Sequence, residues 1–179
     1  TGNYPEALQS IKLKQELKNR VKISSTIKEE ICKLPKTMHP MTQLSCALLF
    51  MQQDSIFANK YKDGIPKDIY WEYIYEDILN IIANLPEGCA LIYNNTYSKK
   101  PLDIINESSD LVGTFCQLIG YEEEEFHDFM RLYFLIHCDH EGGNASAHTC
   151  RLVGSTLSDP YLALSSSMNA LAGPLHGLA

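Results

Sequence analysis

Hydrophobic residues recur every three or four positions along most of the chain, which is the spacing of one buried face of an α-helix. Met41, Leu44 and Leu48 follow this spacing and predict a helix over residues 40–59. Pro40 suits its first turn, because a proline there removes no helical hydrogen bond. No run with a period of two continues beyond a few positions, so no strand is expected. The pattern therefore predicts an all-α fold with several helices of uneven length.

The next hydrophobic pattern predicts a helix over residues 68–97 that begins at Asp68, whose carboxylate can cap the first turn. Pro86 and Gly88 should break or kink this helix, because proline lacks the backbone N–H that an interior position needs. Upstream, the basic residues 12–22 are interrupted by an acidic side chain and are typical of a solvated helix face.

The second half of the chain predicts three more helices. Each is bounded by residues that favour a helix end, such as serine, aspartate or acidic groups at the start and glycine after the last turn. The expected helices begin at Ser109, near Glu122 and at Asp159, and they end at Gly120, near His140 and near Leu171.

Composition narrows the class of protein. The chain has 179 residues, enough for one domain, with 15 basic and 22 acidic side chains and a net charge of −7. This balance disfavours nucleic acid as a partner. No apolar run reaches the length of about 18 residues that a membrane-spanning helix needs, so no membrane partner is expected. Six widely spaced cysteines without a C-x-x-C motif favour small buried thiols in a reducing, intracellular compartment.

Histidines near the end of the chain are the candidates for chemistry. His137 and His140 are three residues apart and should project from one helix face, with Asn144 and His148 close behind. A metal site is disfavoured, because the zinc-protease helix places its histidines four apart with a glutamate between them. The histidines could instead line a pocket as hydrogen-bond donors to an anionic or carbonyl substrate. The alternative is that they are ordinary structural groups, and spacing alone leaves both interpretations open.

Two other groups have simpler interpretations. Cys138 lies between two histidines, but neighbouring residues on a helix point about 100° apart, so we expect a packing residue and not a nucleophile. Tyr70, Trp71, Tyr73 and Tyr75 predict a packed helix interface or an oligomer contact.

Several longer strings closely resemble citrate synthases of the eukaryotic mitochondrial type. The similarity extends in register over the whole chain, and its motifs are long and specific. The apolar end of the chain and the greater length of the family's members indicate an interior fragment. The strings that carry the resemblance are residues 39–45, 70–77, 137–148, 157–161 and 168–178.

The resemblance implies a fold, an assembly and a reaction. Residues 1–179 would form most of the large helical domain, with the small domain absent from this chain. A homodimer would form through the helices near residues 40–59 and 68–97. The complete protein would condense acetyl-CoA with oxaloacetate and water to citrate and CoA, in the mitochondrial matrix, although peroxisomal members of similar sequence exist. No cofactor is implied, since acetyl-CoA is a substrate.

The resemblance also implies roles for individual residues. His176 matches the catalytic histidine that hydrogen-bonds the thioester carbonyl of acetyl-CoA, and His140 matches a histidine that binds oxaloacetate. Asn144 and Ser146 match residues behind them, with Ser146 orienting the ring of His176. The roles of His137 and His148 are expected to be structural. The general-base aspartate, a second catalytic histidine and the substrate-binding arginines would lie beyond residue 179, so the fragment alone should be inactive.

Two alternatives stay open. A synthase of the same fold could use propionyl-CoA to make 2-methylcitrate, and the residues that decide this lie mostly outside the chain. A non-catalytic helical dimerisation module is the second alternative, which the joint presence of the motif residues disfavours. The run Ser165–Ser167 is more polar than is usual in the family, which affects only the expected packing.

Overall fold

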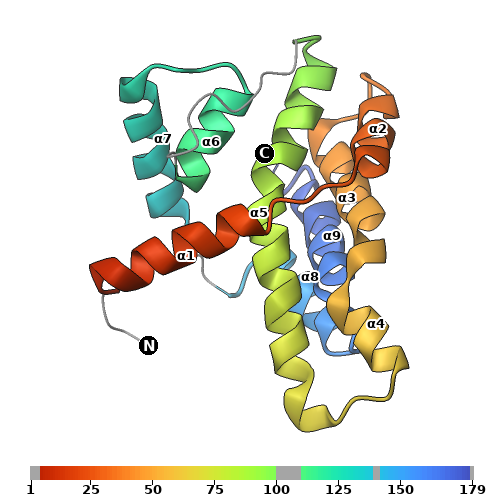
Figure 1. Ribbon diagram of the computed structural model, residues 1–179. Helices are drawn as coiled ribbons and strands as arrows, with labels where there is room; N and C mark the ends of the chain where they lie inside the picture. Colours follow the sequence, from red (N-terminus) through yellow and green to blue (C-terminus); the bar gives the residue numbers. More distant parts are fainter. Residues whose placement is uncertain (1–4, 100–109, 139–141, 178–179) are drawn as a thin grey trace.

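The protein is described here by a computed structural model that covers residues 5–99, 110–138 and 142–177 (Figure 1). Within these ranges the regular structure is entirely helical, as the hydrophobic spacing predicted. None of these helices is long and apolar enough to cross a membrane. The α-helices are α1 (Ala7–Asn19), α2 (Ser25–Lys33), α3 (Pro40–Met51), α4 (Ile56–Lys62), α5 (Tyr70–Thr96), α6 (Leu111–Leu118), α7 (Glu124–His137), α8 (Ala145–Gly154) and α9 (Pro160–Leu171).

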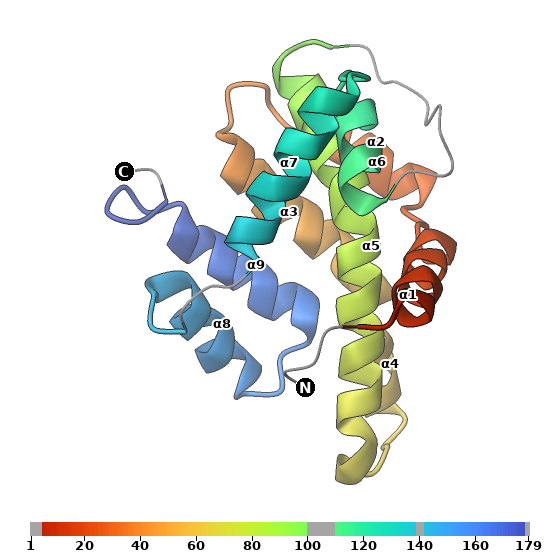
Figure 2. The ribbon, with the colours of Figure 1, turned by 90° about the vertical axis from the view of Figure 1, so that its left-hand side faces the viewer.

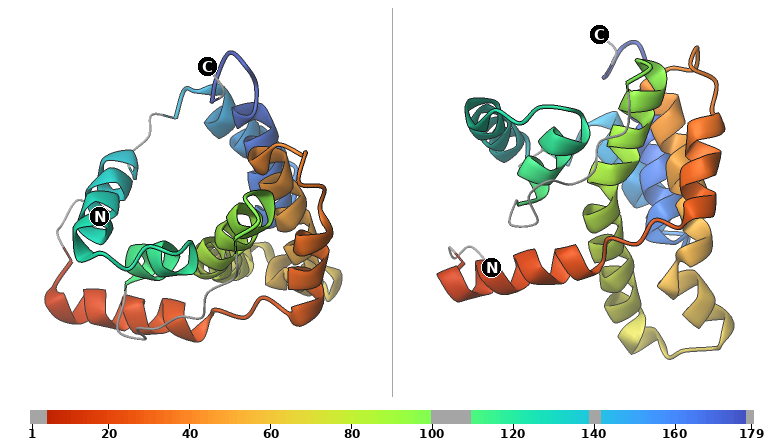
Figure 3. Two further views of the ribbon diagram at one scale, coloured as in Figure 1. Left: turned by 90° about the horizontal axis from the view of Figure 1, so that it is seen from above. Right: turned by 45° about the horizontal axis from the view of Figure 1, so that its top comes forward.

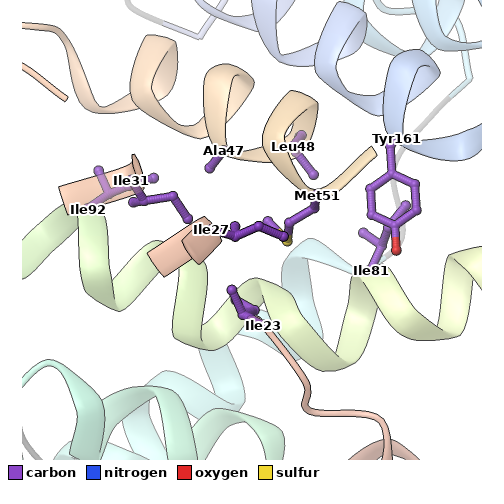
Figure 4. Close-up of a cluster of buried hydrophobic side chains, with 9 residues drawn as sticks. All are labelled: Ile23, Ile27, Ile31, Ala47, Leu48, Met51, Ile81, Ile92 and Tyr161. Carbon is purple, nitrogen blue, oxygen red and sulfur yellow. The ribbon is translucent and has the colours of Figure 1, made fainter. Parts of the chain in front are cut away.

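The core lies where α2, α3 and α9 pack around the long helix α5 (Figure 1). Its side chains are aliphatic apart from one buried tyrosine, and they interdigitate between these four helices and the segment that precedes α2 (Figure 4). Burying such side chains supplies the main driving force for folding. The cluster consists of Ile23, Ile27, Ile31, Ala47, Leu48, Met51, Ile81, Ile92 and Tyr161.

Helices α3 and α9 approach closely because small serines face each other across their contact. Ser45 and Ser165 are both buried, and their hydroxyl oxygens are 2.8 Å apart. The hydroxyl of Ser165 also donates to the backbone carbonyl of Ser45 at 3.0 Å. The hydroxyl of Ser166 donates to the carbonyl of Leu162, one turn earlier in α9. The hydroxyl groups of Ser165 and Ser166, in the unusually polar run of this helix, therefore make hydrogen bonds, and those of Ser165 lie in the interior.

The single helix expected over residues 40–59 is wrong. The chain forms α3, a 3₁₀ turn at Gln52–Asp54, and the separate helix α4. Ser55 leaves the helical conformation and caps α4, since its hydroxyl accepts from the N–H of Ala58. Buried Asp77 on α5 accepts from the N–H groups of Ile56 and Phe57, which satisfies the new helix start.

Of the expected break or kink at Pro86 and Gly88, the break is wrong, because α5 runs without interruption from Tyr70 to Thr96. Both residues are buried, and the Cα of Gly88 faces the methyl group of Met51, with 3.6 Å between that methyl and an ideal Cβ. Packing against the core thus outweighs the hydrogen bond that a proline costs. The helix begins two residues later than expected, after a 3₁₀ turn at Lys67–Ile69, so Asp68 is not its N-cap.

The ends of the later helices confirm part of the prediction. Asp159 caps α9 and Pro160 opens it, and α9 ends at Leu171, as expected. Gly120 follows α6 in the left-handed conformation, with φ of 94°. The N-cap of α6 is Asp110, whereas Ser109 lies outside the described residues. Helix α7 spans Glu124–His137 and therefore stops before residue 140.

Helices α1, α6 and α7 lie on one side of α5, away from α3 and α4 (Figures 2 and 3). Helix α1 crosses α5, and none of its residues is buried, in agreement with the solvated face expected over residues 12–22. A cavity of about 510 Å³ lies between α1, α5 and α6, with Leu13, Leu17 and Leu111 among its lining residues. The cavity belongs to this side of the molecule, whereas α8 and α9 pack together next to α3.

Candidate functional site

The candidate site starts at the first residue of the turn into α8. Asn144 has an extended backbone conformation, with φ of −73° and ψ of 161°, and its side-chain oxygen Oδ1 accepts from the N–H of Ala147 at 2.9 Å. Asparagine is among the residues that best satisfy the free N–H groups at a helix start. Asn144 is therefore the N-cap of α8, a helix that the hydrophobic pattern did not predict.

Ser146 lies in the first turn of α8 and is buried. Its hydroxyl donates to the same Oδ1 of Asn144 at 2.6 Å. From the facing helix α9, the buried hydroxyl of Ser167 donates to the backbone carbonyl of Ser146 at 3.0 Å. The position of Ser146 is thus fixed from both helices, through its side chain and its backbone.

His176 is held in the turn that follows α9. Its N–H donates to the carbonyl of Gly173 at 2.9 Å, and the N–H of Gly177 donates to that of Leu171 at 2.9 Å. A Cβ on Gly177 would lie 2.5 Å from the oxygen of Leu171, closer than real Cβ atoms come, so the turn requires glycine there. The ring nitrogen Nε2 of the half-buried His176 lies 3.1 Å from the hydroxyl oxygen of Ser146.

Three of the four predicted site residues therefore form one hydrogen-bonded chain, although 30 positions separate Ser146 from His176. The fourth, His140, lies outside the described residues. Asn144, Ser146 and His176 all come from the α8–α9 pair and the turn after it. The contact expected between Ser146 and the ring of His176 is present.

The other histidines of the motif are separate from this chain. His137 is exposed at the end of α7, where its ring stacks on Tyr133 and its Nδ1 lies 2.7 Å from the carbonyl oxygen of Tyr133. His148 is exposed on α8. The expectation that Cys138 is a packing residue is wrong, because it is exposed. Over the ranges that the structure describes, no three histidine, cysteine or acidic side chains form a group that could hold a metal ion.

Sequence reasoning missed two supports of the site. The guanidinium of Arg151 donates to the carbonyl of Gly142 at 3.1 Å, and it lies where a side chain on Gly142 would begin. It thus ties the segment before α8 to the last turn of this helix. The second support is Ser167, which the sequence marked only as unusually polar. A signal for α8 itself was present in the asparagine before it and the glycine at its end.

The arrangement suits hydrogen bonding to a ligand. One ring nitrogen of His176 is occupied by Ser146, and within the described residues no hydrogen bond engages the other, Nδ1. A fixed, half-buried imidazole of this kind can present a single nitrogen to a ligand oxygen.

Comparison with known proteins gives the family. The family model described as "Citrate synthase, C-terminal domain" matches residues 1–179. The chain is 46% identical to a probable mitochondrial citrate synthase of Glossina morsitans morsitans and 47% identical to the mitochondrial citrate synthase of Tetrahymena thermophila; each alignment covers 100% of this chain and 39% of the relative. It is 44% identical to the peroxisomal citrate synthase of Saccharomyces cerevisiae, with the same coverage.

Solved structures agree on the fold. The citrate synthase of Pyrobaculum aerophilum superposes with a TM-score of 0.86 at 24% identity, over 98% of this chain and 44% of that one. The citrate synthase of Thermoplasma acidophilum, in a complex with carboxymethyl-CoA and oxaloacetate, superposes with a TM-score of 0.81 at 23% identity. The superposition covers 98% of this chain and 44% of that one. The chain spans about two fifths of the length of the curated relatives it matches. Because the family model covers all of its residues, the chain belongs to the citrate synthase family.

Proposed function

We propose that the complete protein condenses acetyl-CoA with oxaloacetate and water to give citrate and CoA. Membership of the family supports the reaction. The observation that carries the proposal for this chain is the hydrogen bond between Ser146 and His176, which fixes the imidazole that the family resemblance identifies as catalytic. A dimerisation module without catalysis would have no need for a histidine held in this way.

In this proposal His176 donates a hydrogen bond to the thioester carbonyl oxygen of acetyl-CoA. A methyl proton next to a thioester is a very weak acid, and its removal places negative charge on that oxygen. A donor held in position in the substrate complex stabilises this charge as it develops, without the cost of reorienting in the transition state. The stiff turn around His176 holds the ring in place for this role.

The resemblance assigns oxaloacetate binding to His140, and the relative from Thermoplasma acidophilum binds oxaloacetate together with a CoA derivative. Asn144 and Ser146 would support the site from behind. A base aspartate and a second histidine are needed from residues beyond 179, so residues 1–179 alone should release no CoA. No metal or cofactor takes part in the proposed reaction.

A homodimer is the assembly that we propose. Trp71, Tyr75, Ile78 and Ile82 follow one another at helical spacing along α5, and all are exposed, Trp71 to 64% and Ile78 to 42%. A continuous apolar stripe on a long helix is typical of an interface between subunits. Helix α3 adds the exposed Leu49. By resemblance to the mitochondrial relatives, we propose that the protein acts in the mitochondrial matrix.

The first test is free CoA release from acetyl-CoA and oxaloacetate by the full-length protein. We expect release to fall about 100-fold or more in His176→Ala, since removing one such donor costs this much in other enzymes. His148→Gln, at an exposed histidine of the same motif, is the matched control and should keep normal turnover.

Propionyl-CoA in place of acetyl-CoA separates the alternatives. Faster turnover of propionyl-CoA would favour 2-methylcitrate synthesis. Oxaloacetate binding without release of CoA from either thioester would show a module that has lost catalysis. Unchanged citrate formation in His176→Ala would refute the role given to this residue.

A further inference from the structure

The hydrogen bonds around Asn144 determine which of its two side-chain atoms is the oxygen. The backbone N–H of Ala147 lies 2.9 Å from one of these atoms. A backbone N–H can only donate, so the atom it contacts must be an acceptor. The atom is therefore the amide oxygen Oδ1, and the amide NH₂ group points elsewhere.

This assignment fixes the direction of the next hydrogen bond. The hydroxyl oxygen of Ser146 lies 2.6 Å from the same Oδ1, a distance typical of a strong O–H···O bond. Since the amide oxygen has no proton to give, Ser146 must be the donor. A serine hydroxyl carries only one proton, and here that proton points at Asn144.

The third bond in the chain then has only one direction left. Nε2 of His176 lies 3.1 Å from the hydroxyl oxygen of Ser146, whose proton is already used. Ser146 can still accept through its lone pairs, so the ring nitrogen has to donate. Nε2 of His176 therefore carries a proton.

We propose that Asn144, acting through Ser146, sets the tautomer of His176: in the free protein the neutral imidazole is protonated at Nε2 and bare at Nδ1. Asn144 is thus a positioning residue, because it touches the imidazole only through Ser146. The amide oxygen of Asn144 thus has two roles. It caps helix α8, and through Ser146 it determines which nitrogen of the imidazole carries the proton.

The consequence for catalysis rests on the proposed function. A bare Nδ1 is an acceptor and cannot donate to a thioester carbonyl. For Nδ1 to donate from a neutral ring, Nε2 must release its proton to solvent and Nδ1 must take one up, which leaves the number of protons unchanged. The hydroxyl of Ser146 then turns about its Cβ–Oγ bond from Asn144 to Nε2. Binding of a carbonyl or carboxylate oxygen at Nδ1 therefore competes with Asn144 for the Ser146 proton.

The direct test is nitrogen NMR of the full-length protein labelled with ¹⁵N-histidine, recorded at an alkaline pH at which the spectrum shows a neutral ring. The spectrum of His176→Gln identifies the His176 signals by their absence. We expect Nε2 to be the protonated, pyrrole-type nitrogen and Nδ1 the bare, pyridine-type nitrogen. A predominantly Nδ1-protonated ring in the free protein would overturn the proposal.

Two substitutions of Asn144 test the mechanism. Asn144→Gly removes the acceptor but keeps a residue that helices tolerate at their start, and it should move the ring toward the Nδ1-protonated form. Asn144→Asp keeps an acceptor for both Ala147 and Ser146, and it should retain the Nε2 form. An Asn144→Gly protein with the wild-type tautomer would refute the control by Asn144. Circular dichroism checks that the variants fold, and the wild-type spectrum decides the tautomer even if one does not.

Addition of oxaloacetate with carboxymethyl-CoA tests the switch itself. The carboxylate of this compound offers an acceptor near the position of the thioester oxygen, so the Nδ1-protonated form should increase; no change would refute the switch. The tautomer of the free protein is measured without any substrate. If the full-length protein does not catalyse the proposed reaction, the proposed tautomer can still be correct. If the free ring is protonated at Nδ1, the proposed tautomer is wrong, but the proposed reaction is not affected.

Discussion

The turn that holds His176 leaves no room for an added atom at Gly177. Gly177→Ala would push the new Cβ against the carbonyl oxygen of Leu171, 2.5 Å away in the present geometry. The turn has to open, and His176 moves with it. Because a misplacement of about 1 Å can reduce a rate about 100-fold, we expect the full-length variant to lose about this much in kcat.

Steady-state kinetics of CoA release measures this change. Gly154→Ala is the control, since a Cβ on this residue at the end of α8 meets no atom within 4 Å. Its kcat should stay near the wild-type value. Equal kcat values for the two variants would show that the turn does not set the position of His176.

At the same scale, the sequence could identify the site residues but not how they meet. His140, Asn144, Ser146 and His176 were assigned by resemblance, and spacing alone left open whether the histidines line a pocket or are ordinary structural groups. Thirty positions separate Ser146 from His176, and their contact depends on a turn whose shape no local pattern specifies. The contact of Arg151 with Gly142 depends on the conformation of a long side chain, so the sequence could not predict it either.

At the scale of elements, Ser55 decides where one helix ends and the next begins. Its hydroxyl is fully buried, accepts from the N–H of Ala58 and donates to Asp77 at 2.7 Å. Ser55→Ala removes the cap and leaves a buried carboxylate oxygen with one donor fewer. We expect the free energy of unfolding to fall by about 2 kcal/mol, as for the loss of a cap and of a buried hydrogen bond.

Denaturant unfolding of the full-length protein measures this loss. Ser10→Ala, at an exposed serine of α1, should change the free energy by no more than about 0.5 kcal/mol. A Ser55→Ala protein as stable as this control would mean that the break between α3 and α4 does not depend on the cap.

Asp77 predicts a pH dependence of stability. Burial raises the pKa of its carboxyl above the ordinary value, although Ser55 and the N–H groups of Ile56 and Phe57 act against this, and the charge of nearby Asp159 adds to it. Since the pKa is higher in the folded state, the contribution of Asp77 to stability is fully present below its ordinary pKa of about 3.9. It is lost as the pH rises through the raised value.

The matched variant Asp77→Asn cannot ionise at this position. We expect the difference in free energy of unfolding between wild type and Asp77→Asn to shift against the wild type as the pH rises from about 4. Urea unfolding at a series of pH values measures the difference. A difference that stays constant with pH would contradict the raised pKa.

Element prediction failed where tertiary contacts overrode local signals. Pro86 marks a break in any local analysis, yet α5 passes through it because the residues around it are buried in the core. Helix α8 has few apolar residues and exposes Leu152, so its hydrophobic pattern is weak. Helix α9 was predicted with its correct ends, because Asp159 and Pro160 are strong local signals for a helix start.

At the scale of the whole molecule, the exposed stripe on α5 gives the proposed dimer a direct test. Ile78→Glu places a charge in the middle of this stripe, where a partner would have to bury it. We expect the full-length protein to shift from dimer to monomer in light scattering coupled to size-exclusion chromatography. Glu72→Gln, at an exposed residue of the same helix, should leave the mass unchanged.

An Ile78→Glu protein that stays dimeric would show that the interface lies elsewhere.

The overall class of the fold could be predicted from the sequence, since helical spacing runs through most of the chain. The arrangement of α1, α6 and α7 on one side of α5 was not, because it depends on contacts between segments distant in the sequence.

The double use of the Asn144 oxygen joins the order of a helix to the state of a side chain. When the first turn of α8 opens, the N–H of Ala147 loses its acceptor at the same moment as Ser146 loses its own. Hydrogen exchange at the backbone amide of Ala147 therefore reports how often the hydrogen-bonded chain that supports the imidazole of His176 is broken. A ligand that stabilises the bound position of His176 should slow this exchange. The amide of Ala147, which has no role in the chemistry, would then report the fraction of molecules in which the site is ordered.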